Sequence, residues 1–250
     1  MAVAASGQVS INANGIVKVP SDEETLLLFD PEPESFAAEA EAYIQSHPLT
    51  QSLYDNPKFL PSRPHLKIPP ALRPLNLTGG TLLGERKVEV PPLAFTTRDG
   101  SEYVTIQYLG SALCGHPGII HGGLLATLLD EGLARCCFPA LPNKVGVTAS
   151  LKIDYRVPCR AEQYVVLRAE TQKVEGRKAW VKGWIETLPA PEEWEVEGLN
   201  GEKKGKDPVR LVEAEALFVE PKGAATMLRA YSSQSDSAAN SKPPSPGKEA

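Results

Sequence analysis

The residues best suited to chemistry lie between Cys114 and Phe138, in the stretch "CGHPGIIHGGLLATLLDEGLARCCF". Within it, His121-Gly122-Gly123 precedes an apolar run with helical character. The start of a helix carries unpaired backbone N–H groups and the positive end of the helix dipole, and glycines let a ligand approach that backbone closely. Such a helix start could form an oxyanion hole for acyl transfer, in which one donor typically contributes roughly 10²–10³-fold in rate.

Two adjacent carboxylates, Asp130 and Glu131, interrupt the apolar run. On a helical wheel Asp130 lies on the flank of the apolar stripe among small neighbours, whereas Glu131 lies on the other side and can pair with Arg135 at i+4. A carboxylate among apolar neighbours is costly to bury unless it is paired or used. Asp130 is therefore either a surface carboxylate at the helix edge or a catalytic group, acting as a general base on water or as a nucleophile on an activated carbonyl. The stripe consists of Leu125, Leu128, Leu129, Gly132, Leu133 and Cys136.

Other catalytic chemistries have weaker support in the sequence. The residues that could suggest a metal site are Cys114, His116, His121, Cys136 and Cys137. Their spacing fits no ordinary zinc pattern, so we expect neither a metal nor a cofactor. A cysteine nucleophile has no evident base beside it, and the chain contains no G-x-S-x-G elbow of the serine hydrolases.

Composition narrows the class of protein. The 250-residue chain is 42% hydrophobic, which is enough for a substantial core, and its net charge of −5 with no basic stripe argues against nucleic-acid binding. No run of eighteen apolar residues predicts a membrane span, and the first residues resemble neither a signal peptide nor a transit peptide. Four cysteines do not make a disulfide scaffold. We therefore expect a soluble cytoplasmic protein, with a mitochondrial location as the alternative.

The surrounding pattern predicts the elements that position these residues. Strict alternation over Val145–Val157 predicts a half-buried strand, with the odd-numbered residues facing the core and Thr148 on the polar face. Together the elements indicate an α+β fold in which an antiparallel sheet wraps around one long central helix. The other predicted elements are a strand over 81–90, a hairpin at Arg98-Asp99-Gly100, a helix over Gly122–Cys137, two strands joined near Glu175-Gly176 and a last strand over 208–220.

The chain divides into three parts by composition. Residues 1–78 form an N-terminal extension with one helix, over Pro33–Ser46, followed by a proline-rich arm that we expect to be irregular. Residues 79–221 form the catalytic domain, and residues 222–250 form a tail whose composition predicts disorder.

Three segments carry a family resemblance: "GHPGIIHGGLLATLLDEGLA", "VTASLKIDYRVP" and "KVEGRKAWV". They resemble the hotdog-fold acyl-CoA thioesterases, above all the phenylacetate-degradation type and related superfamily members that act on fatty acyl-CoA, and the proline-rich arm resembles that of fungal members. The resemblance covers about Pro91 to Glu220. It implies a hotdog fold, and a homodimer or homotetramer with the active site at a subunit interface.

The resemblance also implies roles for particular residues. His121 would help to hold the substrate carbonyl, and a backbone amide of Gly122 or Gly123 would polarise it. Asp130, nine residues after His121, matches the catalytic carboxylate of the family. Thr148, on the following strand, matches a threonine that assists in similar members.

In "KVEGRK", Arg177 and Lys178 match positions where the family meets the CoA phosphates. The expected function is hydrolysis of an acyl-CoA, with a fatty acyl group as the expected substrate. Three alternatives stay open: a thioesterase acting on acyl groups bound to a carrier protein in lipid or secondary-metabolite assembly, a non-catalytic acyl-CoA-binding or acyl-carrier-binding protein, and a hotdog dehydratase or hydratase.

Overall fold

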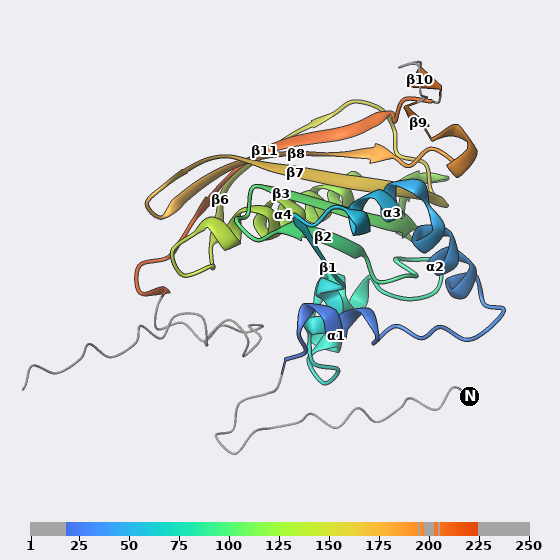
Figure 1. Cartoon of the computed structure of the whole chain (residues 1–250), viewed down its shortest axis with the longest axis horizontal. Helices are drawn as coiled ribbons and strands as arrows, with labels where there is room; N and C mark the ends of the chain where they lie inside the picture. Colours follow the sequence, from blue (N-terminus) through green and yellow to red (C-terminus); the bar gives the residue numbers. More distant parts are fainter. Residues whose placement is uncertain (1–18, 195, 198–202, 205, 225–250) are drawn as a thin grey trace, which may run out of the picture.

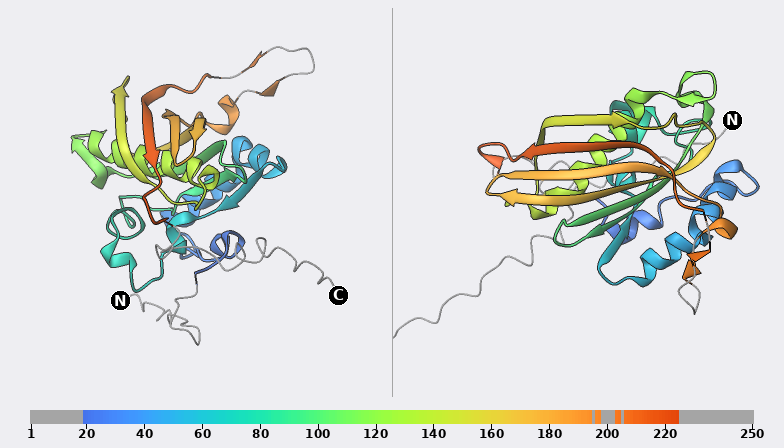
Figure 2. Two further views of the ribbon diagram at one scale, coloured as in Figure 1. Left: turned by 90° about the vertical axis from the view of Figure 1, so that its left-hand side faces the viewer. Right: turned by 90° about the horizontal axis from the view of Figure 1, so that it is seen from above.

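The computed structural model describes residues 19–194, 196–197, 203–204 and 206–224, and its centre is one long helix beneath a curved antiparallel sheet (Figures 1 and 2). The central helix is α4 (Gly122–Cys137), and the sheet has seven strands. In spatial order the strands are β1 (Phe59–Ser62), β2 (Leu93–Thr97), β3 (Glu102–Leu109), β7 (Gln163–Glu175), β8 (Lys178–Thr187), β11 (Arg210–Val219) and β6 (Val147–Tyr155). Every neighbouring pair is antiparallel.

Helix α4 packs on the sheet through the predicted apolar stripe, all six residues of which are buried. Gly132 allows a close approach to the sheet, because a Cβ added there would lie only 2.6 Å from Cδ2 of Leu167 on β7. Burying this stripe removes a large apolar area from water, which is the main favourable contribution to packing. The helix is thus fixed by its leucines, and its two flanks are available for polar groups.

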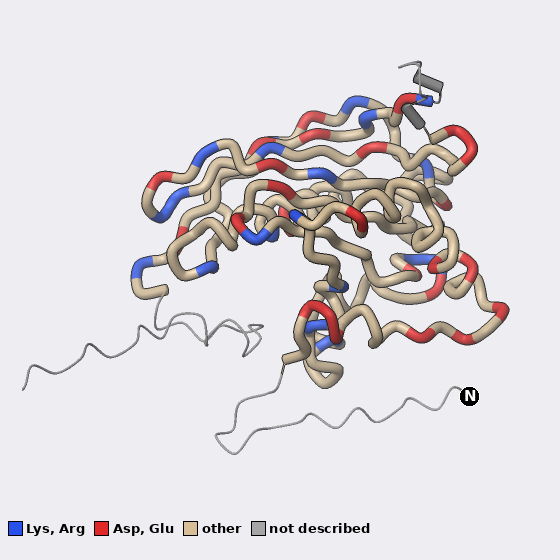
Figure 3. The backbone as a smooth tube through the Cα atoms, in the orientation of Figure 1, with Lys and Arg blue, Asp and Glu red and all other residues tan. Residues whose placement is uncertain are grey.

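The N-terminal part covers the other face of the sheet. Helices α2 (Phe36–Ser46) and α3 (Pro48–Asp55) contribute Ala40, Ile44, Leu49 and Leu53 to a second apolar cluster. In this cluster they meet residues of β2 and β3 that point away from α4, among them Leu93, Phe95, Val104 and Ile106. The N-terminal half of the sheet is therefore buried on both faces. Ion pairs and mixed charges occupy the outer face of β7, β8 and β11 (Figure 3).

Most of the predicted elements are confirmed, together with the α+β class and the sheet around one helix. Helix α4 has the predicted bounds, and α2 lies within the predicted range. The Asp-Gly turn joins β2 to β3, a turn at Gly176 joins β7 to β8, and β11 is the predicted last strand.

The prediction of an irregular proline-rich arm is wrong, and so is the count of one helix before residue 79. The arm contains α3, β1 and two short 3₁₀ helices, and α1 (Asp22–Leu26) precedes α2. Pro48 occupies the first turn of α3, where its missing N–H costs nothing, and His47 caps that helix through its side chain. Pro61 lies in β1, an edge strand that tolerates proline. Since β1 pairs with β2, the sheet includes a strand from the proposed extension.

The strand predicted over 81–90 is also wrong. A π-helix covers Leu77–Thr81, and the following residues contain one isolated bridge between Leu83 and Val88. Gly84 and Arg86 adopt positive φ angles of 120° and 59°, which bend the chain out of an extended path.

The remaining elements are short. They are the 3₁₀ helices Pro64–Lys67, Arg73–Leu75, Ser111–Leu113, Phe138–Ala140 and Pro191–Glu193, and the hairpins β4 (Cys114–His116) with β5 (Ile119–Ile120) and β9 (Val196–Glu197) with β10 (Lys203–Lys204). Among the described residues, each helix is too short or too polar to cross a membrane. All but the first three residues of the tail predicted over 222–250 lie outside the described residues.

Candidate active site

His121 caps the start of α4. Its backbone is extended (φ −62°, ψ 126°), and its Nδ1 accepts a hydrogen bond from the backbone N–H of Gly123 at 2.9 Å. A ring nitrogen that accepts is unprotonated, so in the neutral imidazole the proton is on Nε2. His121 is exposed, and within the described chain its Nε2 has no hydrogen-bond partner. It can therefore donate a hydrogen bond to a ligand.

The two glycines differ in what their backbone groups do. The N–H of Gly123 is occupied by His121, whereas the N–H of Gly122 has no acceptor among the described residues. The carbonyl of Gly122 accepts a hydrogen bond from the hydroxyl of Tyr155 at 2.8 Å. A Cβ at Gly122 would lie 3.3 Å from the Tyr155 ring, so glycine allows this close approach. Gly122 is thus the glycine whose amide is available as an oxyanion donor.

The alternating pattern predicts that Tyr155 faces the core. Its side chain is instead 55% exposed, and its hydroxyl binds the backbone at the start of α4. Its position at the end of an edge strand is set by tertiary packing. Periodicity alone gave no signal that could have found this role.

Asp130 and Thr148 meet beside α4. The Thr148 hydroxyl donates a hydrogen bond to Oδ1 of Asp130 at 2.7 Å, although the two residues lie on different elements. The hydrogen bond fixes the carboxylate. Because Asp130 is half-buried and Thr148 is exposed, the carboxylate also remains open to solvent. A carboxylate held in this way can accept a proton from water or attack an electrophilic carbonyl.

The predicted facing of Thr148 is wrong, and the reason is a bulge in β6. Leu217 of β11 pairs with Ser150, and the next residue, Phe218, pairs with Thr148, so Ala149 is an extra residue on β6. An extra residue reverses the inward and outward alternation of the strand. Leu151 therefore packs on the core while Thr148, three residues earlier, also turns toward α4.

Arg177 and Lys178 lie at the turn between β7 and β8. The Arg177 guanidinium donates to the backbone carbonyl of Glu220 at 2.7 Å, and the Glu220 N–H donates to the Arg177 carbonyl at 2.7 Å. Arg177 thus anchors the end of β11 to this turn. Neither residue contacts His121, Asp130 or Thr148 through a hydrogen bond in the described structure.

Glu131 has different partners from those expected. In place of an ion pair with Arg135, its Oε1 accepts from the Thr78 hydroxyl at 2.7 Å and its Oε2 lies 3.4 Å from Nε2 of the buried His65. Burial raises the pKa of Glu131, but the hydrogen bonds from His65 and Thr78 and the nearby charge of Arg135 together lower it by more, so the net shift is downward. Burial lowers the pKa of His65.

The helix cysteines are unsuited to nucleophilic chemistry. Burial raises the pKa of Cys136 to about 11 and that of Cys137 to about 12, so both remain thiols near neutral pH. Among the described residues, no three His, Cys, Asp or Glu side chains are grouped so that they could hold a metal ion.

The segment that carries these residues matches a known protein family. The family model of the thioesterase superfamily matches residues 117–185, which include the helix start, Asp130 and Thr148. A UPF0644 protein of Schizosaccharomyces pombe is 30% identical over 191 residues, covering 76% of this chain and 68% of that protein. The chain belongs to the thioesterase superfamily, and its fold is the hotdog fold.

Two further relatives are similar over shorter segments. An uncharacterized mitochondrial protein of Candida albicans is 38% identical over 143 residues, which cover 57% of this chain and 59% of that protein. The acyl-coenzyme A thioesterase THEM4 of Mus musculus is 38% identical over 79 residues, covering 32% of this chain and 33% of that protein. The chain thus spans less than two thirds of the length of either relative.

Proposed function

We propose that the chain hydrolyses acyl-CoA thioesters to a free acid and CoA, with a fatty acyl group as the expected substrate. The observation that carries the proposal is the Asp130–Thr148 hydrogen bond on the flank of a helix whose first amide, that of Gly122, has no acceptor in the described part of the chain. Membership of the thioesterase superfamily and the likeness to an acyl-coenzyme A thioesterase support the same substrate class.

The chemistry follows from the charges that develop. Water attacks the thioester carbonyl carbon and gives its proton to Asp130, while the N–H of Gly122 and Nε2–H of His121 stabilise the oxyanion. Collapse of the tetrahedral intermediate breaks the C–S bond, and the CoA thiolate leaves and takes up a proton. Alternatively, Asp130 attacks directly to form a mixed anhydride, which water then hydrolyses. Thr148 positions the carboxylate in either route.

Geometry favours a site completed by a second copy of the chain. Gly122 and Asp130 are eight residues apart on one helix, and at 1.5 Å per residue they are separated by about 12 Å along its axis. The attacking atom and the carbonyl carbon lie within about 3–3.5 Å of one another, and the oxyanion donor binds the oxygen on that same carbon. The two groups of a single chain are therefore poorly spaced for one thioester. An antiparallel second α4 would bring its Asp130 to the first chain's Gly122.

Strand β6 supports a homodimer of this kind. It is an edge strand, paired only with β11 among the described residues. Val147, Tyr155 and Val157 on or beside it are 53%, 55% and 43% exposed. An unpaired edge with exposed apolar residues favours pairing with another copy. The mass of the assembly in solution distinguishes such a dimer from a tetramer of two dimers.

Mixing two inactive variants tests the shared site. Gly122→Pro removes the backbone N–H at the first position of the helix, where proline is tolerated. Gly122→Ala keeps the N–H and, like proline, adds a Cβ that contacts the Tyr155 ring. We expect Gly122→Pro to lose roughly 10²–10³-fold in rate and Gly122→Ala to lose much less. Gly122→Pro mixed with Asp130→Asn should recover about a quarter of wild-type activity, because half of randomly assorted dimers are mixed and each then has one intact site of two. No recovery would mean that both groups act within one chain.

The substrate is tested by thiol release from short, medium, long and aromatic acyl-CoAs, and from the same acyl groups on a carrier protein. Turnover of the CoA esters that depends on Asp130 supports the proposal. Turnover of only the carrier-bound esters favours the carrier-dependent alternative. Binding of acyl-CoA without thiol release favours a non-catalytic binding protein, and hydration of an enoyl thioester without hydrolysis favours a hydratase.

Lys178 is the stronger candidate for a contact with the CoA phosphates, because Arg177 already donates to Glu220. Lys178→Gln should raise the KM for acyl-CoA without changing kcat.

A compartment is also proposed: the name of the Candida albicans relative favours the mitochondrial alternative over the cytoplasm. Imaging a tagged chain in fungal cells distinguishes the two compartments.

A further inference from the structure

A cleft of about 550 Å³ opens on the flank of α4 that carries Glu131. The N-terminal arm, the end of β2 and the C-terminal end of α4 form its walls. Its volume is in the range of small-molecule sites, about 300–1,000 Å³. His121, Asp130 and Thr148 do not line it, so it is separate from the candidate active site.

Three cationic side chains line this cleft from three separate segments: Arg98 beyond β2, Arg135 on α4 and Lys144 before β6. Within the described residues, none of their charged groups has a hydrogen bond or an ion pair, and Arg135 is half-buried. The fourth cation of the lining, Lys67, is paired with Asp22 at 2.6 Å. Unpaired cations gathered around one cavity favour an anionic ligand.

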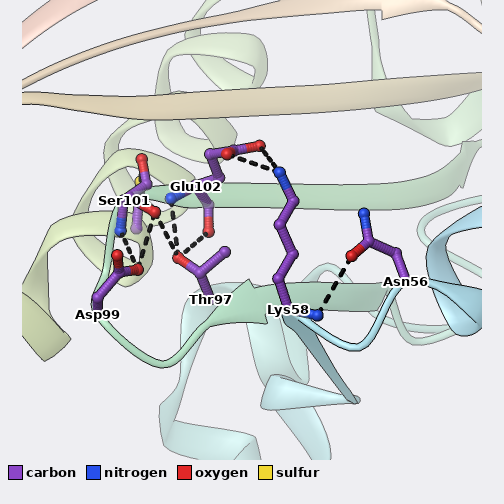
Figure 4. A network of polar contacts seen from close by, with 7 residues as sticks. Asn56, Lys58, Thr97, Asp99, Ser101 and Glu102 are labelled. Carbon is purple, nitrogen blue, oxygen red and sulfur yellow. Dashed lines mark hydrogen bonds and ion pairs between the residues drawn. The ribbon is translucent and has the colours of Figure 1, made fainter.

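The turn that carries Arg98 is held in place (Figure 4). The backbone N–H and hydroxyl of Ser101 donate to Oδ1 of Asp99 at 3.0 and 2.8 Å, and the N–H of Glu102 donates to the Thr97 hydroxyl at 2.9 Å. Lys58, in the turn just before β1, binds the carboxylate of Glu102 at 2.8 Å. These bonds restrict the backbone of the turn, so less ordering of Arg98 is needed on binding.

The one carboxylate of the lining that is not in an ion pair with lysine is Glu131, and its two oxygens are already occupied. The Thr78 hydroxyl donates to one at 2.7 Å, and His65 lies 3.4 Å from the other. The single negative charge of Glu131 does not balance the three unpaired cations, so the net charge of the cleft lining is positive. An anion therefore meets attraction that the neighbouring carboxylate only partly offsets.

Part of the wall is apolar, with Leu60, Ile68, Phe138 and Pro139 beside the polar groups. Phe138 is held edge-on against Phe218, with ring centroids 5.8 Å apart. A site that combines apolar walls with a few convergent charges is suited to an amphipathic ligand. We propose that this cleft binds an organic anion whose carboxylate or phosphate group contacts the three cations and whose apolar part packs against the apolar wall.

Calorimetric titration of the full-length Asp130→Asn variant tests the proposal, because that substitution removes the proposed hydrolytic chemistry and leaves the cleft lining unchanged. The probes are decanoate, decyl phosphate, acetate and inorganic phosphate. We expect decanoate or decyl phosphate to bind, and the one that binds more tightly identifies the head group. Acetate and phosphate should bind at least tenfold more weakly, because they lack the apolar part.

The cleft is identified by added substitutions. Arg135→Gln should weaken binding about tenfold or more, and the exposed Arg98→Gln provides a second test if Arg135→Gln fails to fold. Lys182→Gln is the matched control, because Lys182 is an exposed cation on the outer face of the sheet, paired with Glu215 at 2.9 Å. The proposal is overturned if neither amphiphile binds, if the small anions bind equally well, or if the cleft variants behave like Lys182→Gln. None of these outcomes depends on thioester hydrolysis.

Discussion

Asp130 and Glu131 are adjacent in the sequence, yet helix α4 turns them to different flanks with different environments. Asp130 receives one hydrogen bond, from an exposed threonine, and is half-buried. Glu131 has a partner on each oxygen, one of them the buried His65, and its pKa is lowered. A carboxylate with spare hydrogen-bonding capacity beside solvent is suited to chemistry, whereas one whose oxygens are both occupied is suited to holding elements together.

The partners of Glu131 explain why that flank is structural. Thr78 and His65 both come from the N-terminal arm, so Glu131 joins the arm to the central helix. On the other flank, Thr148 comes from the edge strand β6, where a second chain is proposed to dock. The same helix thus presents one carboxylate to its own chain and one to the proposed subunit interface.

The largest expected difference between the flanks is in activity. Asp130→Asn should lower the thiol-release rate by about 10²–10⁴-fold, because the amide neither accepts the proton of water nor attacks a carbonyl. Glu131→Gln should leave the rate within about twofold, since it keeps the size of the side chain and one acceptor oxygen. Steady-state kinetics on both variants checks this. Equal losses of activity would contradict the separation of roles.

Thr148 should have an intermediate effect. Removing its hydroxyl in Thr148→Val takes away a hydrogen bond to a charged group, worth about 1.5–3 kcal/mol, which corresponds to a loss of about 10–150-fold in kcat. Thr148→Ser keeps the hydroxyl and should retain most of the rate. Thr148→Ser should also keep the melting temperature of the wild type, because it keeps the hydrogen bond to Asp130. A rate that falls equally in both variants would show that the hydroxyl is not what matters.

These two flanks also show how far the sequence could be interpreted. Helix α4, its buried stripe and the special position of Asp130 follow from local periodicity, which is strong because the helix is long and apolar. The Asp130–Thr148 contact does not, because a single extra residue in β6 reverses the facing of the strand. The partners of Glu131 are more than fifty residues away in the sequence, in an arm rich in proline, where no periodic signal exists.

On the Glu131 flank the expected effect is on stability. Glu131→Leu leaves the His65 N–H without its acceptor and the Thr78 hydroxyl with only the longer contact to Oδ1 of Asn76, at 3.4 Å. The expected cost is about 1–3 kcal/mol in the free energy of unfolding. The melting temperature of a chain of this size should fall by about 2–4 °C per kcal/mol. Glu131→Gln should recover part of this loss. Thermal unfolding followed by circular dichroism measures both, and an unchanged melting temperature for Glu131→Leu would show that the arm is held by other contacts.

The smallest expected effect is a pH dependence of stability on the same flank. Burial lowers the pKa of His65 and of His47 below their ordinary value of 6.5, so the unfolded chain binds protons that the folded chain does not. Stability should therefore fall as the pH drops below about 6.5. Glu131, with its lowered pKa, stabilises the fold above an unfolded value of 4.5, and that contribution is lost as the pH falls further. The slope of melting temperature between pH 7.5 and 5 should be reduced in His65→Gln, with His47 supplying what remains, and should be unchanged in Asp130→Asn. A steeper slope in His65→Gln would mean that protonated His65 is stabilised by Glu131 more than burial disfavours it.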